Sequence, residues 1–249
     1  MTRAARQHGK MTPARQWART AAVSLWLAAW CVPAVAQGLR FAFESGSWFG
    51  AAPVTVMTMR GEVQAGDATR FRQFIVNNRE RFIEHGGRVV FVIDGGDVPE
   101  AVLLGELLRD ALAEAWLPDS ASSRCVSACF FMFVHAASRS AVADAVGMHR
   151  PYFDAQALAR ASPGSVRARY ETLATELRTR MQQLSVPVAL VERMFGLAAD
   201  EVYWLSPEDL AALGSRQAWF NDYLAARCSG TNEDAAGASV AACVDELLR

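Results

Sequence analysis

The stretch that decides the fold is Arg88-Val89-Val90-Phe91-Val92-Ile93-Asp94-Gly95-Gly96-Asp97-Val98-Pro99-Glu100-Ala101. Residues 88–93 form a run rich in β-branched side chains, which is typical of a strand covered on both faces. Gly95 and Gly96 end the run. Asp97 can cap a following helix, and Pro99 fits its first turn. The stretch therefore predicts a strand, a tight glycine turn and a helix.

The same alternation extends along the chain. Further strands are predicted over short apolar stretches, at 40–44, 54–63, 143–148 and 202–205. Helices are predicted where apolar residues recur at helical spacing or a cap residue stands, at 67–85, 154–197 with breaks at 162–164 and 185–187, and from Ser206 onward. Strands that alternate with helices favour an α/β fold with a parallel sheet.

The first 36 residues differ from the rest in composition. They carry five basic residues and no acid, then an apolar run from Ala21 to Val32, then Pro33-Ala34-Val35-Ala36. This order predicts a signal peptide cleaved after Ala36, and therefore a periplasmic or secreted protein. The alternative is an uncleaved leader that anchors the protein in a membrane, although the apolar run is shorter than the ~20 residues that a span needs.

The charge balance excludes several classes of function. Beyond residue 36 the chain keeps 20 basic residues and 26 acids, a formal net charge of −6. A nucleic-acid partner would want a basic face, so none is expected. Lys10, in the leader, is the only lysine. The rest of the chain therefore cannot form a serine–lysine dyad, a Schiff base or a P-loop.

Four cysteines follow the leader. In an exported protein an even number of cysteines suggests disulfides. Cys228 and Cys243 bracket a polar loop and are predicted to pair, whereas Cys125 and Cys129 either pair with each other or stay reduced. No cysteine pair has the two-residue gap of a zinc site, and His85, His135 and His149 lie far apart in the sequence, so no metal site is predicted.

Three features stand where strands should end, which is where open α/β sheets place their sites. Gly95-Gly96 follows one predicted strand, Ser127 opens a helix, and His149 ends another strand. A nucleophilic serine needs a base nearby, and the oxyanion of its intermediate needs N–H donors. His135, in the helix after Ser127, is interpreted as a packed helix-end histidine rather than as that base.

Together these segments resemble the proteolytic subunit of the Clp protease. The resemblance rests on Val89–Ala101, on Cys125-Val126-Ser127-Ala128-Cys129, on Gly147-Met148-His149-Arg150-Pro151 and on Tyr203–Gly214, and it covers roughly residues 56–216. It implies a Clp/crotonase-like spiral of β-β-α units, with a mostly parallel sheet and a helical excursion. The expected domains are a signal peptide at 1–36, this fold at 37–227, and a C-terminal tail at 228–249.

The resemblance also implies roles for individual residues. Ser127 matches the nucleophile and His149 the general base, and the N–H groups of Gly96 and Ala128 match the oxyanion hole. The family's aspartate falls on Val202, so the third member of the triad is replaced. Glu201 and Asp200 lie one and two residues upstream and could substitute only if the loop shifts; Asp200 is taken as the candidate.

The expected function is an exported serine hydrolase of the Clp type. It would act on peptides or unfolded segments, without cofactor or ATPase partner, as a homo-oligomer. The alternative is a non-catalytic Clp-like binding or assembly protein that has lost the triad acid. A crotonase-type thioester enzyme is disfavoured, because coenzyme A is not expected outside the cytoplasm.

Overall fold

The computed structural model describes residues 38–47, 53–152, 162–198 and 200–228. The chain divides into two compact units, Met1–Val35 and Ala36–Arg249, and every described residue lies in the second. The predicted leader, and the predicted tail beyond Cys228, lie outside the described residues. Within the described ranges, no helix combines the length and the apolar character that a membrane crossing requires.

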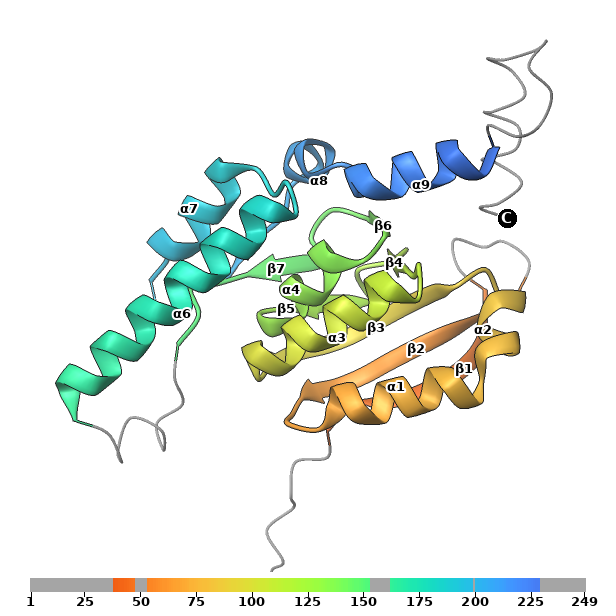
Figure 1. The fold of residues 1–249 in the computed structure, drawn as a ribbon, viewed down its shortest axis with the longest axis horizontal. Helices are drawn as coiled ribbons and strands as arrows, with labels where there is room; N and C mark the ends of the chain where they lie inside the picture. The colour runs from red at the N-terminus through yellow and green to blue at the C-terminus, as the bar shows by residue number, and fades with distance from the viewer. Residues whose placement is uncertain (1–37, 48–52, 153–161, 199, 229–249) are drawn as a thin grey trace, which may run out of the picture. The chain divides into compact units, whose positions relative to one another are not determined.

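The described residues form one sheet of eight strands, joined by helices (Figure 1). The strands are β1 (Arg40–Gly46), β2 (Val54–Val63), β3 (Arg88–Gly96), β4 (Glu114–Leu117), β5 (Arg124–Val126), β6 (Ser138–Ala141), β7 (Val146–Met148) and β8 (Tyr203–Trp204). The helices are α1 (Asp67–Asn77), α2 (Arg79–Glu84), α3 (Val98–Asp110), α4 (Ala128–His135), α6 (Pro163–Gln183), α7 (Val188–Gly196), α8 (Pro207–Leu213) and α9 (Ala218–Cys228).

Most of the sheet is parallel. Strands β2, β3, β5 and β7 lie next to one another and run parallel, with β1 and β8 antiparallel at the two ends of this row. The first residues of β3 also pair with β4, which pairs with β6 in the same parallel sense. The predicted α/β fold with a mostly parallel sheet is thereby confirmed. Because parallel strands end at one edge, the carboxyl ends of β2, β3, β5 and β7 lie together there.

The helices that follow β2, β3 and β5 cover the sheet. Figure 1 shows α3 lying between α1 and α4, along the strands. Helix α4 consists of eight buried residues, four of which are Phe130, Phe131, Met132 and Phe133. Since α4 is apolar on all sides, it forms part of the core. It therefore holds the segment just before it, which contains Ser127, in a fixed position.

Several predicted boundaries are confirmed. Strand β2 spans the predicted residues 54–63, and β3 begins at Arg88 as predicted. The Asp97 carboxylate accepts a hydrogen bond from the Glu100 N–H at 2.7 Å, which is the predicted cap of α3. Helices α6 and α7 are separated near the predicted break at 185–187.

Other predictions were incomplete or wrong. The helix predicted at 67–85 is two helices, because Asn78 leaves helical geometry and its side-chain amide donates to the Phe74 carbonyl at 2.8 Å. Asparagine side chains compete in this way with the helix's own hydrogen bonds. Strands β4 and β6 had not been predicted. They are four residues long, and pairing with neighbouring strands rather than a local pattern creates them.

Candidate active site

A cavity of about 830 Å³ opens where the four parallel strands end. Its lining comes from the ends of β2 and β3, the first turn of α3, the segments around Ser127 and His149, and one face of α6. Gly96, Ser127 and His149, which lie up to 53 positions apart in the sequence, line this one cavity. The structure therefore brings these three predicted site residues together.

Ser127 occupies a sharp turn between β5 and α4. Its backbone has φ 61° and ψ −120°, a conformation that residues with a Cβ rarely adopt. Such a conformation costs about 1–3 kcal/mol and persists only where its surroundings impose it. Two main-chain bonds do so, because Ser127 donates to the Gly147 carbonyl at 3.0 Å and accepts from the Phe130 N–H at 2.9 Å. Strand, strained serine and helix together form a sharp turn with Ser127 at its centre.

The glycine turn after β3 makes room for the Ser127 side chain. Gly95 has φ 132°, and a Cβ placed on it would lie 3.2 Å from the Ser127 hydroxyl oxygen. Gly96 has φ 123°, and a Cβ there would lie 2.1 Å from the Val63 carbonyl oxygen, closer than any real contact. Both positions therefore require glycine. Gly96 itself is exposed and lines the cavity, so its main chain is accessible there.

Ala128 contributes to the site only through its main chain. Its side chain is fully buried and does not line the cavity. As the first residue of α4, Ala128 carries an N–H that has no acceptor within the helix. The positive end of the α4 dipole lies at the same place and favours negative charge beside Ser127.

His149 follows β7 and lies half-buried in the cavity wall. Its Nδ1 lies 2.8 Å from the Arg150 carbonyl oxygen. Because a carbonyl only accepts, Nδ1 carries the proton in this contact and Nε2 is left as the basic nitrogen. The Tyr152 ring stacks on the imidazole, with 5.4 Å between centroids. Pro151 restricts Arg150 to extended backbone, which positions that carbonyl.

The predicted third residue, Asp200, forms no hydrogen bond or ion pair with His149 in the described part of the chain. Asp200 is exposed, and no hydrogen bond or ion pair among the described residues joins a carboxylate to His149. Strand β8 pairs Tyr203 with Met148, so one step further along the same register Val202 comes opposite His149. The main-chain carbonyl of Arg150 occupies the role at Nδ1 that a carboxylate would fill in a triad.

The Ser127 hydroxyl and the His149 ring are not hydrogen-bonded to each other within the described part of the chain. Both residues line the same cavity. Hydrogen bonds between catalytic groups are often long without substrate and shorten only in the complex.

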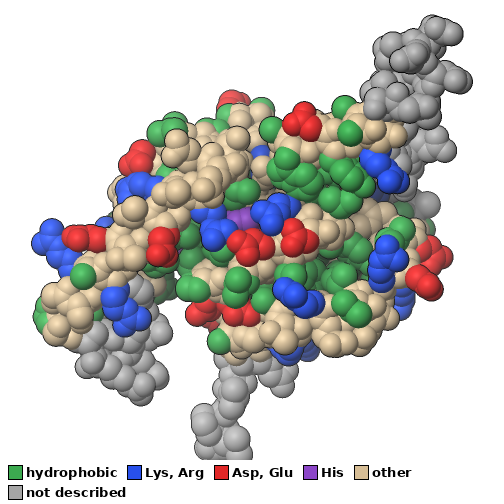
Figure 2. Space-filling model, viewed as in Figure 1, with side chains coloured by type: hydrophobic (Ala, Val, Ile, Leu, Met, Phe, Trp, Pro, Cys, Tyr) green, Lys and Arg blue, Asp and Glu red, His purple; other side chains and the backbone are tan. Residues whose placement is uncertain are grey.

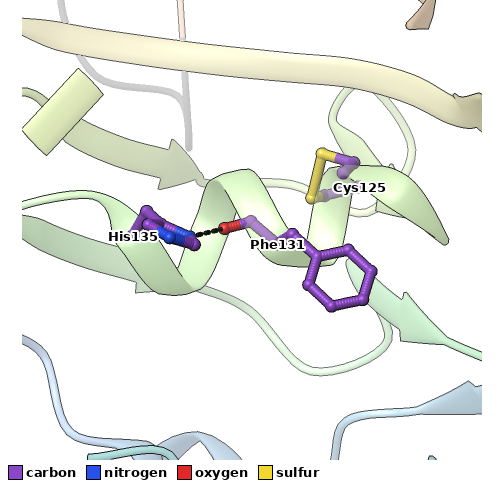
Figure 3. The surroundings of a disulfide bond; sticks show 4 residues. Cys125, Phe131 and His135 are labelled. Carbon is purple, nitrogen blue, oxygen red and sulfur yellow. Dashed lines mark hydrogen bonds between the residues drawn. A yellow bond between two sulfur atoms is a disulfide. The ribbon is translucent and has the colours of Figure 1, made fainter. Parts of the chain in front are cut away.

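Two predictions concern cysteines. Cys125 and Cys129 form a disulfide, which settles the alternative left open by the sequence (Figure 3). Cys228 is buried and is also disulfide-bonded, to a partner outside the described residues. Since Cys243 lies there, its pairing with Cys228 stays a prediction.

Sequence reasoning missed part of the cavity wall. Helix α6 contributes five lining residues, Ala168, Arg169, Thr172, Leu173 and Glu176. No local pattern in the sequence assigns α6 or Tyr152 to a site, because their nearness to Ser127 arises only from packing. Among the described residues, no group of three or more His, Cys, Asp or Glu side chains is placed to hold a metal ion.

His135 has the structural role that was predicted. It is the last residue of α4, is 1% exposed, and donates from Nδ1 to the Phe131 carbonyl at 2.6 Å (Figure 3). Burial lowers its pKa to about 4. It borders a second hollow of about 410 Å³, on a face where side chains of both charges gather between α3 and α6 (Figure 2). It does not line the cavity that holds Ser127.

Comparison of the sequence with protein-family models and with curated proteins finds no match. Among solved structures, a mutant of the membrane-bound stomatin-specific protease 1510-N matches with a TM-score of 0.43 and 12% sequence identity. The match covers 67% of this chain and 80% of that one. This likeness is too distant to assign a family, so the function is argued from the geometry of the cavity.

Proposed function

We propose that this protein is an exported serine hydrolase of the Clp-protease type, which cleaves peptides or unfolded segments with Ser127 as nucleophile and His149 as general base. The observation that carries the proposal is the conformation of Ser127. It is a strained serine between a strand and a helix, and it lines a cavity that a histidine also lines.

The proposed reaction begins with attack of the Ser127 hydroxyl oxygen on a substrate carbonyl. His149 Nε2 takes the hydroxyl proton and passes it to the leaving amine as the acyl–serine forms. Water then repeats the sequence and releases the acid. The Nδ1–H contact with the Arg150 carbonyl supports this assignment, because it leaves Nε2 free to accept the proton.

The N–H groups of Gly96 and Ala128 are proposed as the oxyanion hole. Gly96 lies at the exposed end of β3 and lines the cavity together with Ser127, and Ala128 follows Ser127 at the start of α4. Negative charge developing on the substrate oxygen would be stabilised by both donors and by the α4 dipole. Removing one such donor in a hydrolase typically costs about 100–1,000-fold in rate.

The finer fold assignment and the cellular setting belong to the same proposal. We infer a Clp/crotonase-type spiral, and the branching of the sheet at β3 supports it. The composition of residues 1–36 and the disulfide chemistry support export. The proposed protein works as a homo-oligomer, without an ATPase partner, a cofactor or nucleic acid.

A non-catalytic binding or assembly protein is the second candidate. The observation that favours it is Val202, an apolar residue where the triad acid would lie opposite His149. Loss of the orienting acid lowers the rate of a serine protease by about 10⁴-fold. The two candidates differ in whether Ser127 is chemically reactive.

Labelling with a fluorophosphonate separates them, because this reagent traps activated serines. The wild-type chain should be labelled at Ser127, and Ser127→Ala should not be labelled at all. The labelling rate of His149→Ala should be lower than that of wild type by at least about 100-fold. Peptide mapping of the adduct identifies the modified residue. Folded wild-type protein that stays unlabelled, or that carries the label elsewhere, would favour the binding protein.

A further inference from the structure

The Cys125–Cys129 disulfide spans the turn that contains Ser127. Cys125 lies in β5 and Cys129 in the first turn of α4, with 5.1 Å between their Cα atoms. Only three residues separate them, and Ser127 is the middle one. Figure 3 shows the bond at the start of α4, beside the Phe131 side chain, which lines the cavity.

A cross-link of this kind acts locally. In the chain-entropy account a disulfide restricts the unfolded chain less when the loop it closes is shorter. This loop is very short, so the bond adds little to the free energy of unfolding by restricting the unfolded chain. Its larger effect is on the local structure of the turn. Both cysteines are fully buried, which keeps the bond out of contact with solvent.

The residue inside the loop has the strained backbone. Ser127 does not cap α4 with its side chain, so the helix does not compensate for the strain. Relaxation to an ordinary negative φ would turn the chain at Ser127 and move Cys125 relative to Cys129. The disulfide ties these two residues together and therefore opposes the relaxation. A Cβ on Gly95 would lie 3.2 Å from the Ser127 hydroxyl oxygen, so opening of the turn would change the position of this hydroxyl relative to Gly95.

We propose that Cys125 and Cys129 are positioning residues, whose disulfide holds the Ser127 hydroxyl in its reactive place beside Gly95. This inference rests on the proposed function, because reactivity of Ser127 is what the bond would support. It assigns to the disulfide a role in the rate of the chemical step rather than in substrate binding.

The test compares the full chain without the Cys125–Cys129 disulfide and the full chain without the disulfide of Cys228. Cys125→Ala/Cys129→Ala removes the bond around Ser127, and Cys228→Ala is the matched control that removes the other one. Fluorophosphonate titration gives the maximal rate constant of labelling and the half-saturating concentration. We expect the double variant to lose about tenfold or more in the rate constant, with the half-saturating concentration within about twofold of wild type. Cys228→Ala should keep both values. A folded double variant with the wild-type rate constant would overturn the inference.

Two further measurements keep the test decisive. If the double variant does not fold, the Cys228→Ala protein is treated with dithiothreitol. The reagent's two thiols are oxidised to its cyclic disulfide while Cys125 and Cys129 become thiols. Thiol alkylation and mass spectrometry show when the buried Cys125–Cys129 bond has been reduced. Labelling should fall with that reduction and return on reoxidation, and labelling that stays constant in protein shown to be reduced contradicts the inference.

Hydrogen exchange of the amides at 125–130 reports on the turn without using reactivity. Faster exchange on loss of the bond, confined to this segment, is the expected result. If the wild type is not labelled but exchange accelerates, the proposed function fails while the disulfide still holds the turn. Unchanged exchange shows that the disulfide does not hold it.

Discussion

Ser127 and Ser206 each precede a helix in this protein, and they are used in opposite ways. Ser206, before α8, has ordinary extended backbone at φ −76°, and its hydroxyl accepts from the Asp209 N–H at 3.2 Å. The Asp209 carboxylate in turn accepts from the Ser206 N–H at 3.0 Å, which completes a capping box. Ser127, before α4, has φ 61° and makes no side-chain cap.

The difference lies in where each hydroxyl is directed. At Ser206 it stabilises a seven-residue helix that needs a cap because it is short. Helix α4 is buried on all sides, so packing holds it without one. The Ser127 hydroxyl is then available to the cavity, at the expense of backbone strain. A serine that gives up a cap and accepts strain is better explained by function than by stability.

The strongest contrast is expected between alanine substitutions at the two serines, because one should abolish labelling and the other should lower stability. Ser127→Ala should abolish fluorophosphonate labelling and change the free energy of unfolding by no more than about 0.5 kcal/mol, because no cap is lost. Ser206→Ala should keep full labelling and destabilise by about 1 kcal/mol through loss of the cap. Labelling and urea denaturation of both variants measure the two effects. Loss of labelling in folded Ser206→Ala would remove the distinction between the two serines.

The next effect concerns the other end of α4. His135 has a pKa near 4 in the folded protein because burial disfavours its charged form, whereas an unfolded histidine titrates near 6.5. Between these values the unfolded chain binds the extra proton. Stability is therefore complete above the unfolded pKa and is lost as pH falls, by about 2 kcal/mol between roughly pH 7 and pH 5.

The measurement is the free energy of unfolding at both pH values, for wild type and for His135→Gln. Between the two pH values, the free energy of unfolding of His135→Gln should fall by about 2 kcal/mol less than that of wild type. Equal pH dependence in the two proteins would contradict the assigned burial. It would also weaken the claim that packing of α4, rather than a cap, holds Ser127.

A third prediction tests whether a carboxylate beside His149 would raise the reactivity of the Ser127 hydroxyl. Val202→Asp places a carboxylate opposite His149, where a triad acid would stabilise the imidazolium. Labelling of Ser127 should accelerate by about tenfold, since the Arg150 carbonyl orients the ring but carries no net charge. Val202→Asn is the control for polarity alone. Equal rates for the two variants would mean that position 202 has no influence on the base.

The smallest effect isolates the strain itself. Ser127→Gly should be more stable than wild type by up to about 1 kcal/mol, because glycine adopts positive φ without steric cost. Ser206→Gly should instead lose a few tenths of a kcal/mol, as is usual at a cap. Urea denaturation of both variants gives the comparison. Destabilisation by Ser127→Gly would show that the turn is not strained.

The sequence predicted the frame of this fold well where local signals were strong. The apolar run at 88–93, the Asp97 cap and the Ser206-Pro207 helix start are each specified by a few neighbouring residues. It failed where the determinant was distant or subtle. Strands β4 and β6 depend on their neighbours in the sheet, and the break at Asn78 depends on one side-chain hydrogen bond.

The amino-acid sequence alone specifies the class of fold and the residue types that can carry chemistry. Repeated strand–helix order specifies a parallel sheet, and the absence of lysine beyond Lys10 excludes lysine chemistry there. Gly95 and Gly96 mark a place where the backbone lies close to neighbouring segments, with no room for a Cβ.

How these residues meet depends on packing in three dimensions. It brings Ser127 and His149 into one cavity, bonds Cys125 to Cys129, and puts the Arg150 carbonyl instead of Asp200 at the imidazole Nδ1. The physical reason is that a sequence pattern reports on neighbours along the chain. The side chains that line a cavity, and the positive φ of Ser127, are imposed by packing between segments that lie far apart in the sequence.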